Sequence, residues 1–270
     1  MEIIAWFEMA IFLVTGAVTG FIAGLFGVGG GTIVVPVMML FLERTDIAPS
    51  LIMPLSVGTS LASIFFTGSS ATFAQLKMKT LNMVLVKKLT LGMMMGAMLG
   101  AVVSHYLPFA LYKGLMGLFL FWVAIQMFFQ LRPEPSRSLP SNNRLFFISS
   151  IIGLFSSLFG IGGGVLTVPY LVWCQVKVNE AVATASACGL PIALSGAVTY
   201  AVLGFETAGL PKGSTGFILW PAVIPLVASS VFFAPFGARL SQHLPTQQLK
   251  KYFALFLLLV SLRLIASLFN

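Results

Sequence analysis

Hydrophobic residues are concentrated in ten runs along the chain, and short polar segments separate the runs. Most runs approach the roughly 20 apolar residues that a helix needs to cross a bilayer. The runs lack the alternation of apolar and polar positions that is typical of transmembrane β-barrel strands. The pattern therefore predicts an all-α polytopic membrane protein. The predicted segments are residues 3–26, 31–42, 51–74, 83–104, 108–131, 145–159, 165–176, 181–203, 215–238 and 249–269.

One stretch of the chain occurs twice, as GFIAGLFGVGGGTIVVPVMML at residues 20–40 and as GLFSSLFGIGGGVLTVPYL at residues 153–171. Each copy consists of a hydrophobic helix, a glycine-rich break and a second hydrophobic run. Irregular backbone inside a membrane is costly unless it is buried in protein or lines a cavity. Broken helices at corresponding positions of two halves indicate the binding centre of a transporter. The repeat therefore places the expected function at the two breaks.

Weaker matches extend the duplication over nearly the whole chain, and a hydrophilic linker divides the copies. We predict a first membrane repeat at residues 1–131, a cytoplasmic linker at 132–144 and a second membrane repeat at 145–270. Each repeat has four to five hydrophobic segments, and its first pair is broken by glycine or re-entrant. An odd number of crossings per repeat, five or three, would invert the second copy relative to the first.

The distribution of basic residues favours this inverted arrangement. Lys77, Lys79, Lys87 and Lys88 follow the third segment of the first repeat, whereas the basic residues of the second repeat precede its last segment. The positive-inside rule assigns both groups to the cytoplasm, and only inverted copies satisfy that assignment. Both termini are then expected outside the cytoplasm, in a multi-pass protein of the cell (cytoplasmic or inner) membrane.

Composition agrees with lipid as the solvent. Hydrophobic residues make up 58% of the 270 positions and charged residues only 8%, whereas soluble domains carry roughly 25% charged residues. The net charge of +8 is explained by basic cytoplasmic loops, so no nucleic-acid partner is expected. The first segment lacks a basic leading region, which favours a retained helix over a signal peptide.

Motifs for catalysis or metal binding are absent from the sequence. The two cysteines fit no metal spacing, and there is neither an HExxH motif nor a phosphate-binding loop for ATP. We therefore expect no enzyme activity, no cofactor and no metal site. The acidic residues lie at termini, in loops or near segment ends, which argues against a metal-cation exporter and against a carboxylate-based proton pump. Arg263, His105 and His243 are not expected to bind substrate or metal.

The breaks predict an anion site. We expect the second helix of each pair to begin at about Gly30 to Thr32 and at Gly163 to Val165, where unpaired N–H groups and the helix dipole attract anions. The alternative is that these glycines only allow close helix packing. Hydroxyls of the next segments are further candidates, although they could equally bond to carbonyls of their own helices. The predicted substrate-binding residues are Gly27, Gly29, Gly30, Gly31, Thr32, Thr59, Ser60, Gly160, Gly162, Gly163, Gly164, Val165 and Ser186, and Pro36 and Pro169 are predicted to shape the short helices.

The paired LFGVGGG…VP and LFGIGGG…VP motifs, with Gly58-Thr59-Ser60 opening the next segment, resemble the TauE/SafE sulfite exporter family. The resemblance implies a permease for sulfur-containing or organic anions such as sulfite, sulfoacetate or other sulfonates. The second copy departs from the pattern, because it has Thr184-Ala185-Ser186 in place of the GTS element. The leading hypothesis is a secondary transporter working by alternating access, with an anion channel or facilitator as the first alternative and a metal-cation exporter as the second. The expected partners are a small anion and the bilayer, and a homo-oligomer is left open.

Overall fold

The computed structural model describes residues 6–26, 30–129, 138–240 and 247–268. This part of the chain contains ten α-helices and one two-stranded sheet, so the predicted helical class is confirmed, and each predicted segment overlaps a helix. The elements in chain order are α1 (Trp6–Phe26), α2 (Gly31–Leu42), α3 (Pro49–Lys77), α4 (Met83–His105), α5 (Phe109–Phe128), α6 (Asn142–Leu158), α7 (Gly164–Trp173), α8 (Val178–Leu203), β1 (Ser214–Thr215), β2 (Ile218–Leu219), α9 (Trp220–Leu240) and α10 (Gln247–Ala266).

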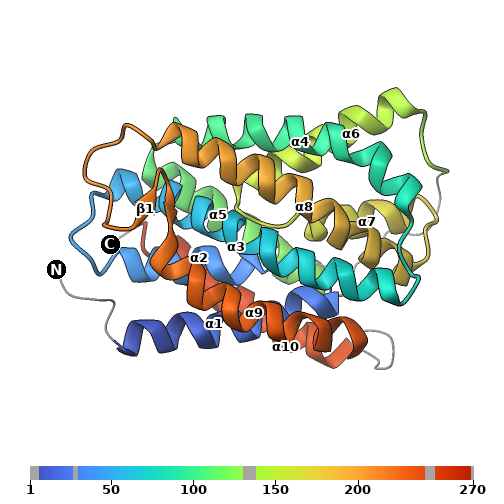
Figure 1. Ribbon diagram of the computed structural model, residues 1–270, viewed down its shortest axis with the longest axis horizontal. Helices are drawn as coiled ribbons and strands as arrows, with labels where there is room; N and C mark the ends of the chain where they lie inside the picture. The colour runs from blue at the N-terminus through green and yellow to red at the C-terminus, as the bar shows by residue number, and fades with distance from the viewer. Residues whose placement is uncertain (1–5, 27–29, 130–137, 241–246, 269–270) are drawn as a thin grey trace.

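The helices lie roughly along one long axis, and the two halves pack against each other reciprocally (Figure 1). Helix α1 packs on α9, while α6 packs on α4; α3 packs on α8, and α5 on α10. Exchanging the first five helices for the last five reproduces each of these pairings. In Figure 1, α1 begins at the left end and α6 at the right end, so the first helices of the two halves run in opposite directions.

Rows of glycine bring these partner helices into close contact. A Cβ atom at Gly16 of α1 would lie 2.3 Å from the carbonyl oxygen of Leu226, and one at Gly20 would lie 2.3 Å from that of Ser230. On α4, a Cβ at Gly96 would lie 1.9 Å from the carbonyl oxygen of Ser150 on α6. Small residues spaced four apart let membrane helices approach in this way. The glycine rows therefore fix α1 on α9 and α4 on α6.

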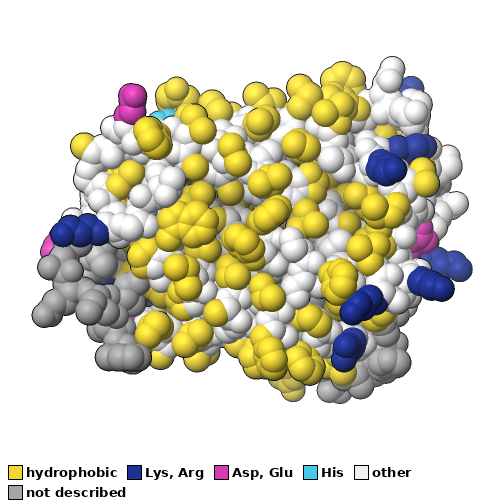
Figure 2. Space-filling view, viewed as in Figure 1, with side chains coloured by type: hydrophobic (Ala, Val, Ile, Leu, Met, Phe, Trp, Pro, Cys, Tyr) yellow, Lys and Arg dark blue, Asp and Glu magenta, His cyan; other side chains and the backbone are white. Residues whose placement is uncertain are grey.

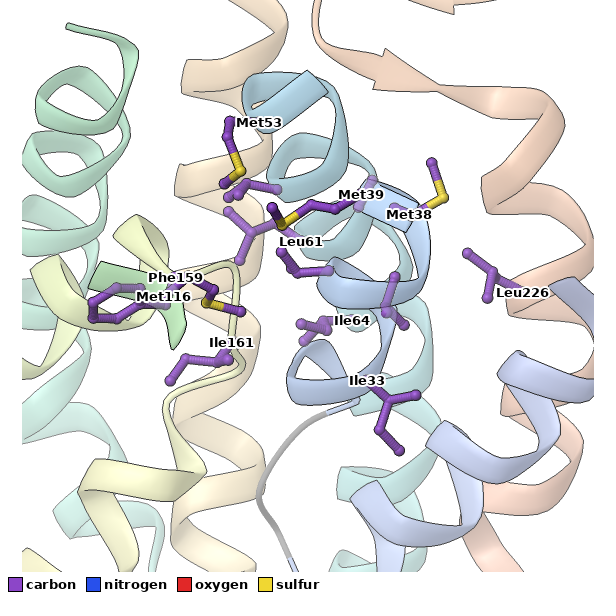
Figure 3. Close-up of a cluster of buried hydrophobic side chains, with 14 of the residues drawn as sticks. Ile33, Met38, Met39, Met53, Leu61, Ile64, Met116, Phe159, Ile161 and Leu226 are labelled. Atoms are coloured by element: carbon purple, nitrogen blue, oxygen red, sulfur yellow. The ribbon is translucent and has the colours of Figure 1, made fainter. Parts of the chain in front are cut away.

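Helices α3 and α8 form the centre of the molecule. The largest hydrophobic cluster joins them to the first short helix and to the second glycine break (Figure 3). In this view Ile33 of α2, Ile64 of α3 and Ile161 of the second break lie in one layer of the core. All three side chains are buried. The start of α2 and the second break therefore lie deep inside the protein, as the cost of irregular backbone in lipid requires.

The surface has the polarity of a membrane protein. Hydrophobic side chains cover the middle of the face in Figure 2, and most of the lysines and arginines gather at its right end. Among the described residues, six helices are long and apolar enough to cross a membrane. In Figure 1 the ends of α3 and α9 and the starts of α4 and α8 lie at the end where α6 begins. These helix ends carry Lys77, Arg239, Lys87, Lys88 and Arg144, and Lys177 directly precedes α8.

The second helices of the two pairs are short. Helix α2 has 12 residues and α7 has 10, which gives lengths of about 18 Å and about 15 Å. Neither is long enough for the roughly 30 Å hydrocarbon layer. Pro36 lies inside α2 and is buried, and Pro169 lies inside α7 and is half-buried. Figure 1 shows α2 returning toward the end at which α1 begins.

One predicted boundary is wrong. The sequence placed the start of a helix at Thr215, but the chain forms a β-hairpin there, in which Ser214 pairs with Leu219, and α9 begins only at Trp220. The cause is the backbone of two glycines. Gly213 has φ +82° and Gly216 has φ +54°, and such positive φ values end a right-handed helix. The apolar sequence of the hairpin resembles a helical span but is buried against α3 and α8.

Candidate functional site: the crossing of the two glycine breaks

The start of α2 lies directly against the second glycine break. A Cβ atom at Gly31 would lie 1.9 Å from the carbonyl oxygen of Gly160 and 2.9 Å from Cα of Ile161. Both neighbours are backbone, so no rotation of a side chain could relieve the overlap. Glycine is therefore required where the break of the first half crosses the break of the second half. The structure thus brings together the two segments that the sequence repeats.

The second break turns sharply between α6 and α7. Gly160 has φ +64° and Gly163, the N-cap of α7, has φ +76°, a conformation that glycine adopts without strain. The turn is fixed by the N–H of Ile161, which donates to the carbonyl oxygen of Ser156 at 2.8 Å. The hydroxyl of Tyr112 on α5 donates to the carbonyl oxygen of Leu158. Glycine at 160 and 163 is thus needed for backbone conformation, beyond its role in packing.

Helix α7 opens with unpaired backbone donors. Within the described residues, the N–H groups of Gly162, Gly163, Gly164 and Val165 have no hydrogen-bond acceptor. The first bonds of the helix are those of Leu166 and Thr167, whose N–H groups donate to the carbonyl of Gly163. Unpaired amides at the positive end of a helix dipole are the groups with which helix termini bind anions. The start of α7 therefore offers hydrogen-bond donors, and anion binding there stays a prediction.

The first turn of α2 is similar. The N–H groups of Ile33 and Val34 donate to the carbonyl of Gly30, each at 3.1 Å, while no described acceptor is bonded to the N–H groups of Gly31 and Thr32. The hydroxyl of Thr32 is fully buried and has no partner in the described part of the chain. A buried polar group without a partner is unfavourable unless something else satisfies it.

The GTS element of α3 makes internal contacts instead. Ser60 Oγ donates to the carbonyl oxygen of Gly160 at 2.8 Å, and Thr59 Oγ1 accepts a hydrogen bond from the N–H of Leu219 at 3.0 Å. A Cβ at Gly58 would lie 2.3 Å from the carbonyl oxygen of Phe217. The three residues therefore hold the second break and the β-hairpin against α3.

The corresponding residues of α8 are not bonded to another segment. Thr184 Oγ1 is buried without a partner in the described residues, and Ser186 Oγ donates to the carbonyl of Val182 in its own helix at 3.0 Å. Gly189, one turn further along, lets α8 approach the second break, because a Cβ there would lie 2.6 Å from the carbonyl oxygen of Gly162.

A small cavity lies at this crossing. It has a volume of about 20 Å³, which is room for about one water molecule. Of the predicted substrate-binding residues, the cavity brings together Gly30, Gly162 and Ser186. Gly31, Gly160, Gly163, Gly164, Val165 and Thr32 lie in the adjoining backbone, Thr59 and Ser60 are engaged elsewhere, and Gly27 and Gly29 lie outside the described residues. The described residues that line it are Ala23, Gly30, Ile64, Thr67, Gly68, Ala71, Gly162, Ser186 and Gly189.

Sequence reasoning missed three hydroxyls near the breaks. Thr67 lines the cavity and its Oγ1 lies 2.5 Å from Ser230 Oγ on α9. Ser156 Oγ and Thr167 Oγ1 are fully buried, have no partner in the described chain, and lie 3.6 Å and 3.7 Å from where a Cβ of Gly163 would be. Ser156 lies just before the glycine motif and Thr167 just after it, so their closeness to the break was the available signal.

Charged side chains lie away from the cavity. No lining residue is ionisable, and no group of three potential metal ligands occurs in the described part of the chain. Lys113 on α5 is buried and pairs with Glu43, at the far end of α2, at 2.7 Å. Arg263 is exposed on α10, and the ring of His105 packs against Phe217 and Tyr106. His243 lies outside the described residues.

The chain also matches a known protein family. The model of the family described as Sulfite exporter TauE/SafE matches residues 12–264. The chain belongs to the TauE/SafE family. The matched range contains both glycine breaks, the GTS element and all residues of the cavity. The protein is therefore a membrane transporter of this family.

Similar proteins from other organisms are also named as probable membrane transporters. A probable membrane transporter protein of Haemophilus influenzae is 31% identical over 253 residues, covering 93% of this chain and 96% of that protein. The probable membrane transporter protein YunE of Bacillus subtilis is 25% identical and covers 96% of this chain and 97% of its own length. A probable membrane transporter protein of Methanocaldococcus jannaschii is 25% identical, with 90% of each chain covered. No solved structure matches the chain.

Proposed function

We propose that this TauE/SafE family member is a secondary transporter of small sulfur-containing or organic anions, of the sulfite and sulfonate class. The observation that carries the proposal is the cavity at the crossing of the two breaks, where backbone amides without partners adjoin uncharged lining residues. Several neutral donors can together hold an anion and still release it, since each helix terminus contributes only about 0.3–2 kcal/mol.

We further propose that the protein works by alternating access, because the cavity is too small for a sulfonate. Its volume suffices for about one water molecule, so binding requires the surrounding helices to move apart. The reciprocal packing of the halves supports a rocking motion about the breaks. The inverted relation of the halves stays a prediction, supported by the opposite directions of α1 and α6 (Figure 1).

The deciding experiment measures anion flux into proteoliposomes for Gly30→Leu and Gly163→Leu. A side chain at Gly30 would meet Thr19 Cβ at 2.9 Å, and one at Gly163 would meet Ile192 Cδ1 at 2.6 Å in a backbone that has φ +76°. Both variants should reach the membrane and lose flux. Gly114→Leu is the matched control, since only the flexible end of Leu268 lies near that position, at 3.2 Å. Normal anion flux through both variants would show that the glycine breaks are not the transport site.

A channel and a transporter predict different kinetics in the same vesicles. A carrier that alternates between two openings gives saturable flux and accelerated exchange when unlabelled anion is present on the opposite side. Linear flux without such exchange would instead establish the channel. A response confined to metal cations would overturn the anion assignment.

We propose that the end bearing most of the basic residues faces the cytoplasm, which would place the linker there and both termini outside. Single cysteines at Ser141 and Ala208, introduced after Cys174 and Cys188 are replaced by alanine, test this orientation. Both positions are exposed, at the linker end and in the turn before β1. A membrane-impermeant maleimide should label the cysteine at 208 in intact cells and the one at 141 only after lysis. The reverse labelling would invert the assignment.

A further inference from the structure

The site at the crossing of the breaks has donors but no fixed positive charge. The nine described residues that line the cavity are uncharged, and Lys113, which is buried on α5, is already paired with Glu43. Glu43 lies at the far end of α2, about 18 Å from its first turn. A bound anion would therefore be held by dipoles alone.

The hydrogen-bond donors at this site include side-chain hydroxyls in addition to the backbone amides of a helix N-terminus. The N–H groups of Gly162, Gly163, Gly164 and Val165 have no acceptors in the described chain. Ser156 Oγ and Thr167 Oγ1 lie beside the same turn, 3.6 Å and 3.7 Å from where a Cβ of Gly163 would be, both fully buried and both without partners in the described chain. Two orphaned hydroxyls beside unpaired amides indicate a ligand that accepts hydrogen bonds from several directions.

The cost of bringing an ion into this site depends steeply on its charge. The desolvation energy of an ion in a medium of low dielectric rises with the square of its charge, so a dianion costs about four times as much as a monoanion of the same size. The favourable interaction with neutral dipoles grows only in proportion to the charge. Without a lysine or arginine to compensate, the balance favours a single negative charge.

We propose, building on the anion transport proposed above, that this site selects singly charged oxyanions and excludes dianions. Sulfite is then recognised as hydrogensulfite, its singly protonated form. Simple alkanesulfonates such as methanesulfonate bind because they carry one charge at all physiological pH values, whereas sulfoacetate, which has an additional carboxylate, is expected to bind weakly. Sulfate, which has nearly the same shape as a small sulfonate and one more charge, is rejected.

Binding to the purified full-length protein tests the proposal with matched ligands. Methanesulfonate and sulfate differ mainly in charge, and we expect methanesulfonate to bind at least about tenfold more tightly by calorimetry, which corresponds to 1.4 kcal/mol. Sulfite affinity should rise as pH falls through the range in which sulfite takes up a proton, approaching tenfold per pH unit on the alkaline side. Methanesulfonate does not titrate there, so its affinity reports any pH effect of the protein itself and should stay constant.

A cavity variant supplies the missing charge. Ala71 lines the cavity on α3 and is 2% exposed, and arginine keeps its charge when buried. Ala71→Arg should improve sulfate binding at least tenfold relative to methanesulfonate, whereas Ala71→Gln, which adds a neutral hydrogen-bonding side chain, should leave the ratio unchanged. If Ala71→Arg does not fold, the wild-type comparison still decides.

The outcomes separate this proposal from the one on which it rests. Sulfate binding as tightly as methanesulfonate, or sulfite affinity that does not change with pH, would overturn charge selection while leaving anion transport in place. If none of these anions binds or moves across the membrane, the proposed function itself fails.

Discussion

The GTS element of α3 (residues 58–60) and its counterpart on α8 (residues 184–186) occupy equivalent positions in the two halves, but their side chains make different contacts. On α3, Thr59 and Ser60 bond to the β-hairpin and to the second break. On α8, Thr184 has no partner in the described residues and Ser186 bonds only to its own helix. The first copy thus stabilises contacts between segments, whereas in the second copy Ser186 lines the cavity. A duplicated sequence can therefore divide support and binding between its copies.

The largest expected effect comes from exchanging the first residue of the two elements. Gly58→Thr places in α3 the residue that α8 carries at position 184, but its Cβ would overlap the carbonyl of Phe217. We expect a loss of about 3 kcal/mol or more, because the overlap is with backbone. Thermal unfolding in detergent measures it. Thr184→Gly, the reverse exchange, should cost only about 1 kcal/mol for the helix, and equal losses would show that the two positions are equivalent after all.

The second effect separates the two threonines. Thr59→Val removes the acceptor of the Leu219 N–H and leaves that buried donor unsatisfied, which costs about 1–3 kcal/mol. Thr184→Val removes a hydroxyl that has no partner in the described chain, so stability should change by less than about 0.5 kcal/mol. Anion flux is the second readout, and only the variant at 184 should lose flux while it keeps its melting temperature. A destabilised Thr184→Val would mean that its hydroxyl has a structural partner.

A smaller contrast is expected for the serines. Ser60→Ala leaves the Gly160 carbonyl without its donor and should cost about 1 kcal/mol. Ser186→Ala removes a bond to a carbonyl within the same helix, so melting should be nearly unchanged while anion affinity falls. The pair of variants is compared by melting temperature and by anion binding. If Ser60→Ala lost anion binding while keeping the wild-type melting temperature, Ser60 on α3 would belong to the anion site.

The smallest effect concerns the ion pair at the far end of α2. Lys113 Nζ lies 2.7 Å from Glu43 Oε1 and 5.5 Å from the ring centre of Phe109. In the second half, Val176 after α7 takes the place of Glu43, so this ion pair has no counterpart there. Lys113→Met should lower stability by about 1 kcal/mol, because Glu43 keeps access to solvent and the aliphatic packing is retained. Anion selectivity should not change, since the pair is remote from the cavity. A changed preference between methanesulfonate and sulfate would show that Lys113 acts on the site.

Much of the fold could be predicted because its signals are local. Helix α2 begins at Gly31 and α7 at Gly164, as the glycine triplets indicated. A glycine-rich stretch shows where the backbone can leave the helix, and a long apolar run indicates lipid as its solvent. The hairpin at Ser214 to Leu219 was missed because its apolar residues match a span, and only its burial against α3 and α8 favours two short strands.

The candidate site could be predicted only in part. Gly30, Gly162 and Ser186, which the sequence proposed, line one cavity, whereas Thr67, Ser156 and Thr167 were found only in the structure. A hydroxyl in an apolar helix has the same sequence signature whether it bonds to its own carbonyl or faces a cavity. The choice depends on which helix lies opposite.

By itself, the sequence determined that the chain lies in lipid, that it is built from two related halves, and where each half breaks its helix. These properties follow from apolar length and from the backbone freedom of glycine, which act over a few residues. Tertiary structure alone decided that Ser60 reaches Gly160, 100 residues away, and that Ser186 faces a cavity. Hydrogen bonds between distant segments depend on how helices pack, and packing is settled by the whole set of interhelical contacts together.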